Sequence, residues 1–146
     1  MNEHLILSNQ ICHRFYKATN AITRAYKPYL NQLDITYPQY LVMMALWETD
    51  VIEVSKVQQQ TQVDAGALSL ILKKLVAKGL IMLNPAEGDK RVKLVCLTQQ
   101  GKEMQLAASD IPMKLRCQFP DFSEADIAQL IQLLDKLNVS LGEANT

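Results

Sequence analysis

The stretch "VDAGALSLILKKLVAKGLIMLNPAEGDKRVKLVCLT", residues 63–98, decides the fold of this chain. Its first half repeats apolar residues at helical spacing and stops at Gly79, a residue type that commonly ends helices. Its second half carries two aliphatic segments on either side of the turn-forming "NPAEGD" at 84–89, which predicts a β-hairpin. The stretch therefore predicts a helix at about 65–78 followed directly by a hairpin.

A shorter helix is expected just before it, at about 53–61 ("EVSKVQQQT"), with "QVDAG" as the connecting turn. Two short helices joined by a tight turn form a helix-turn-helix, and the hairpin adds a wing. One further helix precedes this pair at about 38–48, with Pro38 suited to its first turn and Thr36 or Tyr37 before it. The sequence thus predicts a winged helix-turn-helix at about 38–100.

Long amphipathic segments flank this unit on both sides. An apolar stripe over 5–27 predicts a helix that Pro28 ends or turns. A second helix is expected from Thr98 to about Cys117, and a third from Ser123, where Asp126 makes a variant of the capping box. Their apolar surface exceeds what so small a central unit covers, so we expect a homodimer built by helices at about 5–30 and 103–142. The fold class is mainly α with a small β-hairpin wing.

Composition limits the functional classes. The chain has 146 residues, of which 49% are hydrophobic and 21% charged, values typical of one folded domain. It has no apolar run long enough for a membrane span and no basic-headed secretory signal, so a cytoplasmic location is expected. Its three cysteines lack C-x-x-C spacing, which argues against a disulfide scaffold or a zinc site. We expect no cofactor and no metal.

The charges are unevenly distributed although the formal net charge is zero. Residues 64–102 carry seven Lys/Arg against three Asp/Glu, whereas residues 103–146 carry three against seven. Such asymmetry indicates a localised anion-binding face in the middle of the chain.

Three segments in order, "TYPQYLVMMALWE", "VDAGALSLILKKLVAKGLI" and "GDKRVKLVCLTQQGKE", resemble the MarR family of dimeric winged-helix transcription repressors. The resemblance covers about residues 10–117. Within that family, "ICHRFYKATNAITRAYKPYL" is similar to the regulators that sense organic hydroperoxides, in their two-cysteine form. This resemblance implies that Cys12 is the sensing thiol, that Tyr26 and Tyr37 stabilise its thiolate, and that Cys117 is the resolving cysteine.

The expected partner is double-stranded DNA carrying a pseudo-palindromic operator. The helix at about 65–78 would enter the major groove by its N-terminal end, with Ser69 near a base edge or phosphate and Lys73 and Lys74 on phosphates. The resemblance implies that Arg91 is a wing-tip arginine that enters the minor groove and is oriented by Asp89. Ala65 and Ala67 replace hydroxyls common in related sequences, and residues 83–86 lack the usual basic side chains. We therefore expect weaker phosphate contact or a different operator preference.

The residues around Cys12 leave two interpretations open, a small buried hydrophobe or a reactive thiol. Cys12 and Tyr26 share one helix face, yet they lie roughly 21 Å apart along a straight helix. They could meet if two copies pack antiparallel across a two-fold axis, and the family resemblance implies that same pairing. Cys96 is interpreted as packing. Four further aromatic residues are interpreted as core: Tyr16, Tyr29, Tyr40 and Trp47.

Three functional hypotheses follow. The first is a repressor that releases its operator when an organic hydroperoxide oxidises Cys12 and a disulfide forms with Cys117. The second keeps the repressor but switches it with a non-covalent phenolic or aromatic ligand, so that Cys12 is incidental. The third is a thiol peroxidase, which we disfavour because the sequence offers no catalytic His/Asp pairing; His4 and His13 are isolated. The chain is expected not to be an enzyme.

Overall fold

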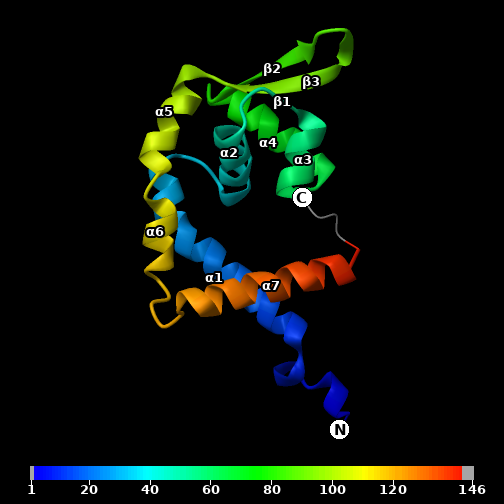
Figure 1. Ribbon diagram of the computed structural model, residues 1–146, viewed down its shortest axis with the longest axis vertical. Coiled ribbons are helices and arrows are strands. Elements are labelled where there is room, and N and C mark those ends of the chain that lie inside the picture. Colours follow the sequence, from blue (N-terminus) through cyan, green and yellow to red (C-terminus); the bar gives the residue numbers. More distant parts are fainter. Residues whose placement is uncertain (1, 143–146) are drawn as a thin grey trace.

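The computed structural model describes residues 2–142 and is mainly helical, with a three-stranded antiparallel sheet of order β1-β3-β2 (Figure 1). The predicted fold class is therefore confirmed. The elements are η1 (Glu3–Leu5), η2 (Leu7–Asn9), α1 (Ile11–Gln32), α2 (Tyr37–Glu48), β1 (Ile52–Glu53), α3 (Val54–Thr61), α4 (Ala65–Ala77), β2 (Ile81–Ala86), β3 (Asp89–Leu97), α5 (Gln99–Ala108), α6 (Ile111–Arg116) and α7 (Glu124–Ser140).

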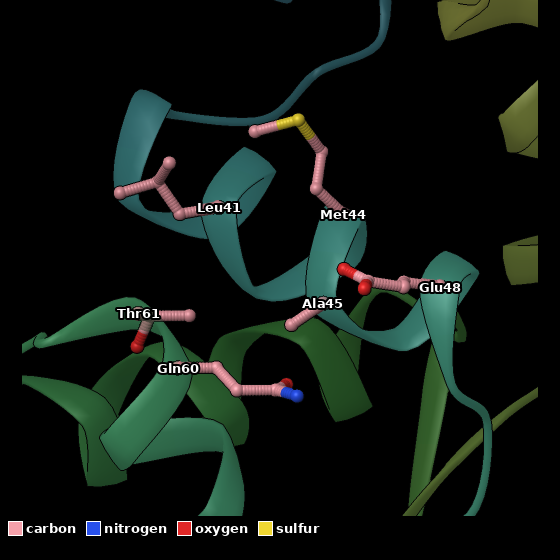
Figure 2. Close-up of a pocket in the computed structure, with 6 residues that line it drawn as sticks. All are labelled: Leu41, Met44, Ala45, Glu48, Gln60 and Thr61. Carbon is pink, nitrogen blue, oxygen red and sulfur yellow. The ribbon is translucent and has the colours of Figure 1, made fainter. Parts of the chain in front are cut away.

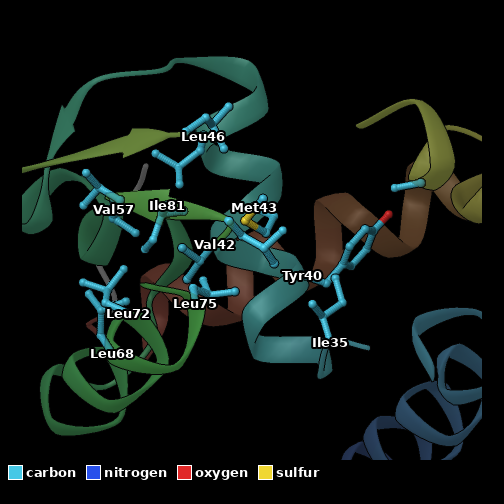
Figure 3. Close-up of a cluster of buried hydrophobic side chains, with 14 of the residues drawn as sticks. Ile35, Tyr40, Val42, Met43, Leu46, Val57, Leu68, Leu72, Leu75 and Ile81 are labelled. Atoms are coloured by element: carbon cyan, nitrogen blue, oxygen red, sulfur yellow. The ribbon is translucent and has the colours of Figure 1, made fainter. Parts of the chain in front are cut away.

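Helix α2 forms the centre of the core. Thr36 caps its first turn, because its side chain accepts from the Gln39 N–H while the Gln39 side chain accepts from the Thr36 N–H. The helix is apolar nearly all round, so neighbours cover it on several sides (Figure 3). The buried cluster around it draws on α2, α3, α4 and the sheet, including Val42, Met43, Leu46, Val57, Leu68, Leu72, Leu75, Ile81 and Val95.

The helix-turn-helix consists of α3 and α4. Helix α3 ends where Gln62 takes the left-handed conformation, with φ of 56°. The carboxylate of Asp64 then caps α4 by accepting from the Gly66 N–H at 3.2 Å. Gly79, with φ of 73°, lets the chain turn from α4 into the sheet. These capping and turn residues keep the two helices short and close together, as the sequence predicts.

Strands β2 and β3 form the wing. They pair in the register Ile81↔Leu97 and Leu83↔Val95, with an irregularity at Pro85/Ala86. The turn is narrower than the predicted 84–89, because Asn84, Pro85 and Ala86 still belong to β2 and only Glu87 and Gly88 lie between the strands. The sequence also did not predict β1, which pairs Ile52 with Val95. A strand of two residues has too few positions to show an alternating pattern.

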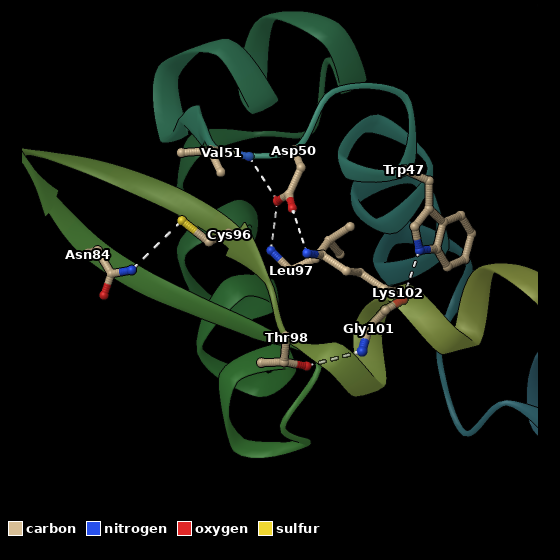
Figure 4. Close-up of polar contacts among 9 residues, drawn as sticks. All are labelled: Trp47, Asp50, Val51, Asn84, Cys96, Leu97, Thr98, Gly101 and Lys102. Carbon is tan, nitrogen blue, oxygen red and sulfur yellow. Dashed lines mark hydrogen bonds and ion pairs between the residues drawn. The ribbon is translucent and has the colours of Figure 1, made fainter.

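The base of the wing is bound to the helical core by polar contacts (Figure 4). Asp50 Oδ1 accepts from the backbone N–H groups of Val51 and Leu97, each at 2.8 Å, and its other oxygen lies 3.8 Å from Lys102 Nζ. Trp47 Nε1 donates to the Gly101 carbonyl at 2.9 Å. The end of α2, the end of β3 and the start of α5 therefore share one network.

Helix α5 begins as predicted, with the Thr98 side chain accepting from the Gly101 N–H at 3.0 Å. Gly101 is required there, because a Cβ would lie 2.1 Å from the Leu80 carbonyl oxygen. The single helix predicted to reach Cys117 is wrong: α5 ends at Ala108 and α6 begins at Ile111. Pro112, near the start of α6, cannot donate to the carbonyl four residues earlier, and this breaks the helix.

Helix α1 differs from its prediction at both ends. Residues 3–9 form two 3-10 turns, so the helix begins at Ile11 and not near residue 5. Pro28 lies inside the helix, which continues to Gln32. The turn beyond Pro28 is held by tertiary packing, because Leu30 is buried and Tyr29 packs against the core. That burial outweighs the backbone hydrogen bond that the proline cannot make.

Helix α7 begins at the predicted capping box, with Ser123 and Asp126 bonded reciprocally. None of its residues is buried, and its exposed apolar side chains include Leu130, Ile131, Leu133 and Val139. Large apolar side chains are also exposed near the start of the chain, at Leu5, Leu7 and Ile11. Within residues 2–142, no helix is both long and apolar enough to cross a membrane.

Candidate functional site

Three tyrosines from two helices lie together beside the α1–α2 connection. Tyr26 of α1 lies 4.8 Å from Tyr37 and 5.7 Å from Tyr40 of α2, measured between ring centroids. Tyr40 is buried and contacts Trp47 edge-on, with 6.3 Å between centroids, whereas Tyr26 and Tyr37 are half-buried. The structure thus brings together the two tyrosines that were predicted to act as a pair, and it adds Tyr40 behind them.

The hydroxyl groups of this cluster stay protonated over the physiological pH range. Burial, with smaller contributions from the neighbouring Tyr37 and Tyr40, raises the pKa of Tyr26 to about 12. Burial also raises the pKa of Tyr37 and of Tyr40 above the ordinary tyrosine value. Each group is therefore available as a neutral hydrogen-bond donor, which is what an anionic partner such as a thiolate requires.

Cys12 lies in the first turn of α1 and is exposed. Within one chain it is thus not a buried core hydrophobe. The fourteen-residue separation from Tyr26 inside one continuous helix corresponds to roughly 21 Å, so a single chain does not bring the two residues together. Tyr16, interpreted from the sequence as core, is 68% exposed on the same helix, and that interpretation is wrong for the single chain.

Cys117 is also exposed and lies at the C-terminal end of α6. Its position relative to α1 is defined by its neighbour, because Gln118 Nε2 donates to the Tyr29 hydroxyl at 3.1 Å. Lys114, on the same helix, lies 5.9 Å from the Tyr29 ring centroid. The end of α6 that carries Cys117 is therefore close to the C-terminal half of α1, whereas Cys12 lies in the first turn of α1.

Cys96 lies in β3 of the wing and is half-buried, and Asn84 Nδ2 contacts its sulfur at 3.7 Å (Figure 4). This position agrees with the interpretation of Cys96 as a packing residue. Among residues 2–142, no group of three or more His, Cys, Asp or Glu side chains is arranged to hold a metal ion.

Helix α4 buries Leu68, Leu72 and Leu75 and presents its other face to solvent. Ser69, Lys73 and Lys74 are all exposed on it. Sequence reasoning missed Leu70, which is 54% exposed between these polar residues. A helical wheel would have revealed it as an apolar residue outside the buried leucine stripe.

The wing tip carries an oriented cation. Asp89 Oδ1 accepts from the Arg91 backbone N–H at 3.0 Å and from Arg91 Nε at 3.2 Å, while the Arg91 side chain remains 92% exposed. The hydrogen bonds from Arg91 hold the pKa of the Asp89 carboxyl below its ordinary value. The aspartate is therefore ionised at neutral pH, and its hydrogen bonds orient the Arg91 guanidinium, which extends into solvent.

Two hollows adjoin α2. One, of about 460 Å³, lies between α2 and α3 and is lined by Leu41, Met44, Ala45, Glu48, Gln60 and Thr61 (Figure 2). Gln60 Oε1 is buried there without a hydrogen-bond partner in the described chain. The other, of about 320 Å³, borders Tyr37 between α1 and α2, with Arg24 and Lys27 in its wall.

Comparisons with known proteins agree with this arrangement. A family model described as "Transcriptional regulator SarA/Rot" matches residues 24–108. The organic hydroperoxide resistance transcriptional regulator of Bacillus subtilis (strain 168) is 40% identical over 110 residues, which is 75% of each chain. A structure of reduced AbfR bound to DNA superposes with a TM-score of 0.80 at 27% identity, covering 97% of this chain and 96% of that one.

A MarR variant from E. coli complexed with operator DNA superposes with a TM-score of 0.74 at 30% identity, covering 87% and 92% of the two chains. The relatives found by these comparisons are regulators of transcription and not enzymes. With its winged helix-turn-helix, its capped α4 and its oriented wing-tip arginine, this chain belongs to the MarR family of winged-helix DNA-binding transcriptional regulators.

Proposed function

We propose that this protein is a redox-sensing repressor that leaves its operator when an organic hydroperoxide oxidises Cys12. Two observations support the proposal: Cys12 is an exposed thiol in the first turn of α1, and a tyrosine cluster whose hydroxyls remain protonated donors lies near the other end of that helix. The B. subtilis relative, named as an organic hydroperoxide resistance regulator, supports the choice of inducer.

The sensing site is formed by two copies of the chain. Tyr26 lies roughly 21 Å along α1 from Cys12 of the same chain, and Tyr37 of α2 lies beside Tyr26, so each thiol takes its donors from the partner. If the two α1 helices pack antiparallel, Cys12 of each chain lies beside the tyrosine cluster of the partner. The apolar side chains exposed on the N-terminal turns and on α7 are the surfaces that such a dimer covers.

The chemistry proceeds in two steps. The Cys12 thiolate attacks the outer peroxide oxygen, the O–O bond breaks, an alcohol leaves, and the sulfur becomes a sulfenic acid. The Cys117 thiol then attacks that sulfur and releases water, forming a disulfide. The peroxide accepts the two electrons that the pair of thiols loses. Hydrogen bonds from Tyr26 and Tyr37 favour the thiolate in the first step.

The disulfide joins two chains. Cys117 lies beside the Tyr29 end of α1 because of the Gln118–Tyr29 hydrogen bond, and Tyr29 is seventeen residues from Cys12, roughly 25 Å along the helix. The two Cα atoms of a disulfide lie within about 7 Å of each other. With α1 intact, Cys12 and Cys117 of one chain are too far apart to bond.

DNA binding uses α4 and the wing. The N-terminal end of α4 enters the major groove with Ser69 at its edge, and Lys73 and Lys74 contact phosphates. Arg91, oriented by Asp89, enters the minor groove. An inter-chain disulfide pulls on α1 and α6, changes the separation of the two winged units, and so removes the match to the two half-sites.

Intact mass under non-reducing denaturing conditions tests this proposal. One equivalent of cumene hydroperoxide is expected to produce a covalent dimer in the wild type and in Cys96→Ser, but not in Cys12→Ser or Cys117→Ser. An unmodified monomer mass in the wild type would exclude the thiol switch.

The α2–α3 hollow favours a second candidate, a repressor switched by a non-covalent ligand such as a small phenol. An apolar wall formed by Leu41 and Met44 suits an aromatic ring, and Gln60 offers a polar group without a partner. Release of DNA by such a ligand from Cys12→Ser protein would favour this candidate.

A further inference from the structure

We infer that Leu70, together with Gly66, forms an apolar contact on α4 that recognises the 5-methyl group of a thymine in each operator half-site. The inference goes beyond the redox switch and rests only on the DNA-binding part of the proposed function. It concerns the exposed face of α4, where the sequence predicts DNA contacts by Ser69, Lys73 and Lys74 but no apolar contact.

The orientation of Leu70 follows from the helix itself. At about 100° per residue, Gly66, Leu70 and Lys73 lie on the side of α4 opposite the buried Leu68, Leu72 and Leu75. Leu70 is 54% exposed, although leucine is among the residues most often buried. It therefore occupies the middle of the face that enters the groove.

Helical side chains lean toward the N-terminus of their helix and cover the preceding turn. The preceding turn below Leu70 contains Gly66, which has no side chain to cover the leucine methyl groups. The apolar surface of Leu70 thus extends toward the leading end of α4, where recognition helices contact base edges.

Gly66 is not explained by packing within the chain. It is not among the glycines with positive φ, and an added Cβ would meet only Asp64 Oδ2, at an ordinary 3.4 Å. Glycine is nonetheless a poorer helix former than alanine. A close approach of DNA at this turn accounts for both the missing side chain and the exposed leucine beside it.

In the major groove, the thymine methyl is the apolar group that a leucine can contact, and it distinguishes thymine from the other natural bases. Lys73, one turn beyond Leu70, and Ser69 beside it are exposed polar neighbours suited to the phosphate contacts that fix the register. The contact provides a means of discrimination that does not need the hydroxyls absent at Ala65 and Ala67.

The test uses the reduced, full-length protein and a duplex selected by it from random double-stranded DNA. Thymines are replaced by uracil one at a time in a half-site, which removes only the methyl group. At one position the wild type is expected to lose affinity about fourfold, which is the effect of removing one methyl group that the complex buries. Leu70→Ala is expected to bind the thymine duplex more weakly and to show no further loss with uracil at that position.

Two variants serve as matched controls. Val76→Ala removes an exposed apolar side chain from the same helix, six residues farther from its leading end, and is expected to keep the full uracil effect. Lys73→Ala is expected to weaken binding equally on both duplexes. If every uracil position affects the wild type and Leu70→Ala alike, the inference is wrong. If the reduced wild type selects no duplex at all, the DNA-binding function itself fails instead.

Discussion

The indole nitrogen of Trp47 donates a hydrogen bond to the carbonyl oxygen of Gly101 at 2.9 Å, and this bond joins α2 directly to the first turn of α5 (Figure 4). The same tryptophan ring packs edge-on against Tyr40, which contacts both Tyr26 and Tyr37. A continuous set of contacts therefore connects the tyrosine cluster with the base of the wing. In the proposed dimer, the thiol of one chain acts on the cluster of the other.

Trp47→Phe is expected to lower the free energy of unfolding by about 1–2 kcal/mol, because the phenyl ring keeps most of the packing but cannot donate to Gly101. Urea denaturation of the reduced protein measures this, and the denaturant slope should not change. Lys90→Ala, at an exposed residue of the wing outside the helices of the expected dimer, is the control and should leave the midpoint nearly unchanged. Equal midpoints for Trp47→Phe and the wild type would show that the bond adds no stability.

Cys12→Ser is expected to bind operator DNA as the wild type does and to stay bound after treatment with cumene hydroperoxide, because serine does not react with the peroxide. Cys117→Ser should release DNA only transiently or progress to the sulfinic acid, since no second thiol traps the sulfenic acid. Fluorescence anisotropy of labelled operator, combined with intact mass, measures both effects. Cys96→Ser is the control, and a defect in its response would assign a role to the wing cysteine.

Tyr26→Phe and Tyr37→Phe are each expected to slow the oxidation of Cys12 about tenfold at neutral pH, since each removes a hydrogen bond that favours the thiolate. Stopped-flow measurement of thiol loss with cumene hydroperoxide gives the rate. Tyr29→Phe is a suitable control, because the Tyr29 hydroxyl bonds to Gln118 and its ring is not part of the cluster of Tyr26, Tyr37 and Tyr40. Equal rates in Tyr26→Phe and Tyr29→Phe would contradict the assigned role of Tyr26.

Stability is expected to fall as the pH rises from 10 toward 12. The pKa of Tyr26 is raised by burial from 10.0 to about 12, so the folded protein holds this proton more tightly than the unfolded chain. The resulting contribution is complete below pH 10 and is lost as the pH approaches the folded-state value. The urea midpoint should fall less steeply with pH between pH 9 and 12 in Tyr26→Phe than in the wild type. An identical fall in both proteins would show that the pH dependence comes from another group.

Arg91→Ala is expected to weaken operator binding about tenfold and to reduce the dependence of affinity on salt, because it removes a cation from the wing tip. Asp89→Asn should weaken binding by a smaller factor, about threefold, because the arginine remains but is less firmly oriented. Lys136→Ala, on α7, is the charge-matched control. If Arg91→Ala and Lys136→Ala bind alike at several salt concentrations, the wing tip does not contact DNA.

The local sequence accounts for most helix boundaries. Capping side chains at Thr36, Thr98 and Ser123 begin helices where predicted, and Gly79 ends the helix-turn-helix as predicted. These signals are readable because each depends on residues within three or four positions of one another. The hairpin and the mainly helical fold class follow from the same short-range patterns.

Tertiary contacts decided what the local patterns could not. Pro28 remains inside α1 because Leu30, two residues later, is buried in a core formed by distant segments. Strand β1 exists because Ile52 pairs with Val95, forty-three positions away. The 4.8 Å approach of the Tyr26 and Tyr37 rings is of the same kind, because the rings belong to two helices that only the packed fold brings together. The separation of Cys12 from Tyr26, in contrast, follows from the sequence alone, because one continuous helix places both residues on one face and roughly 21 Å apart.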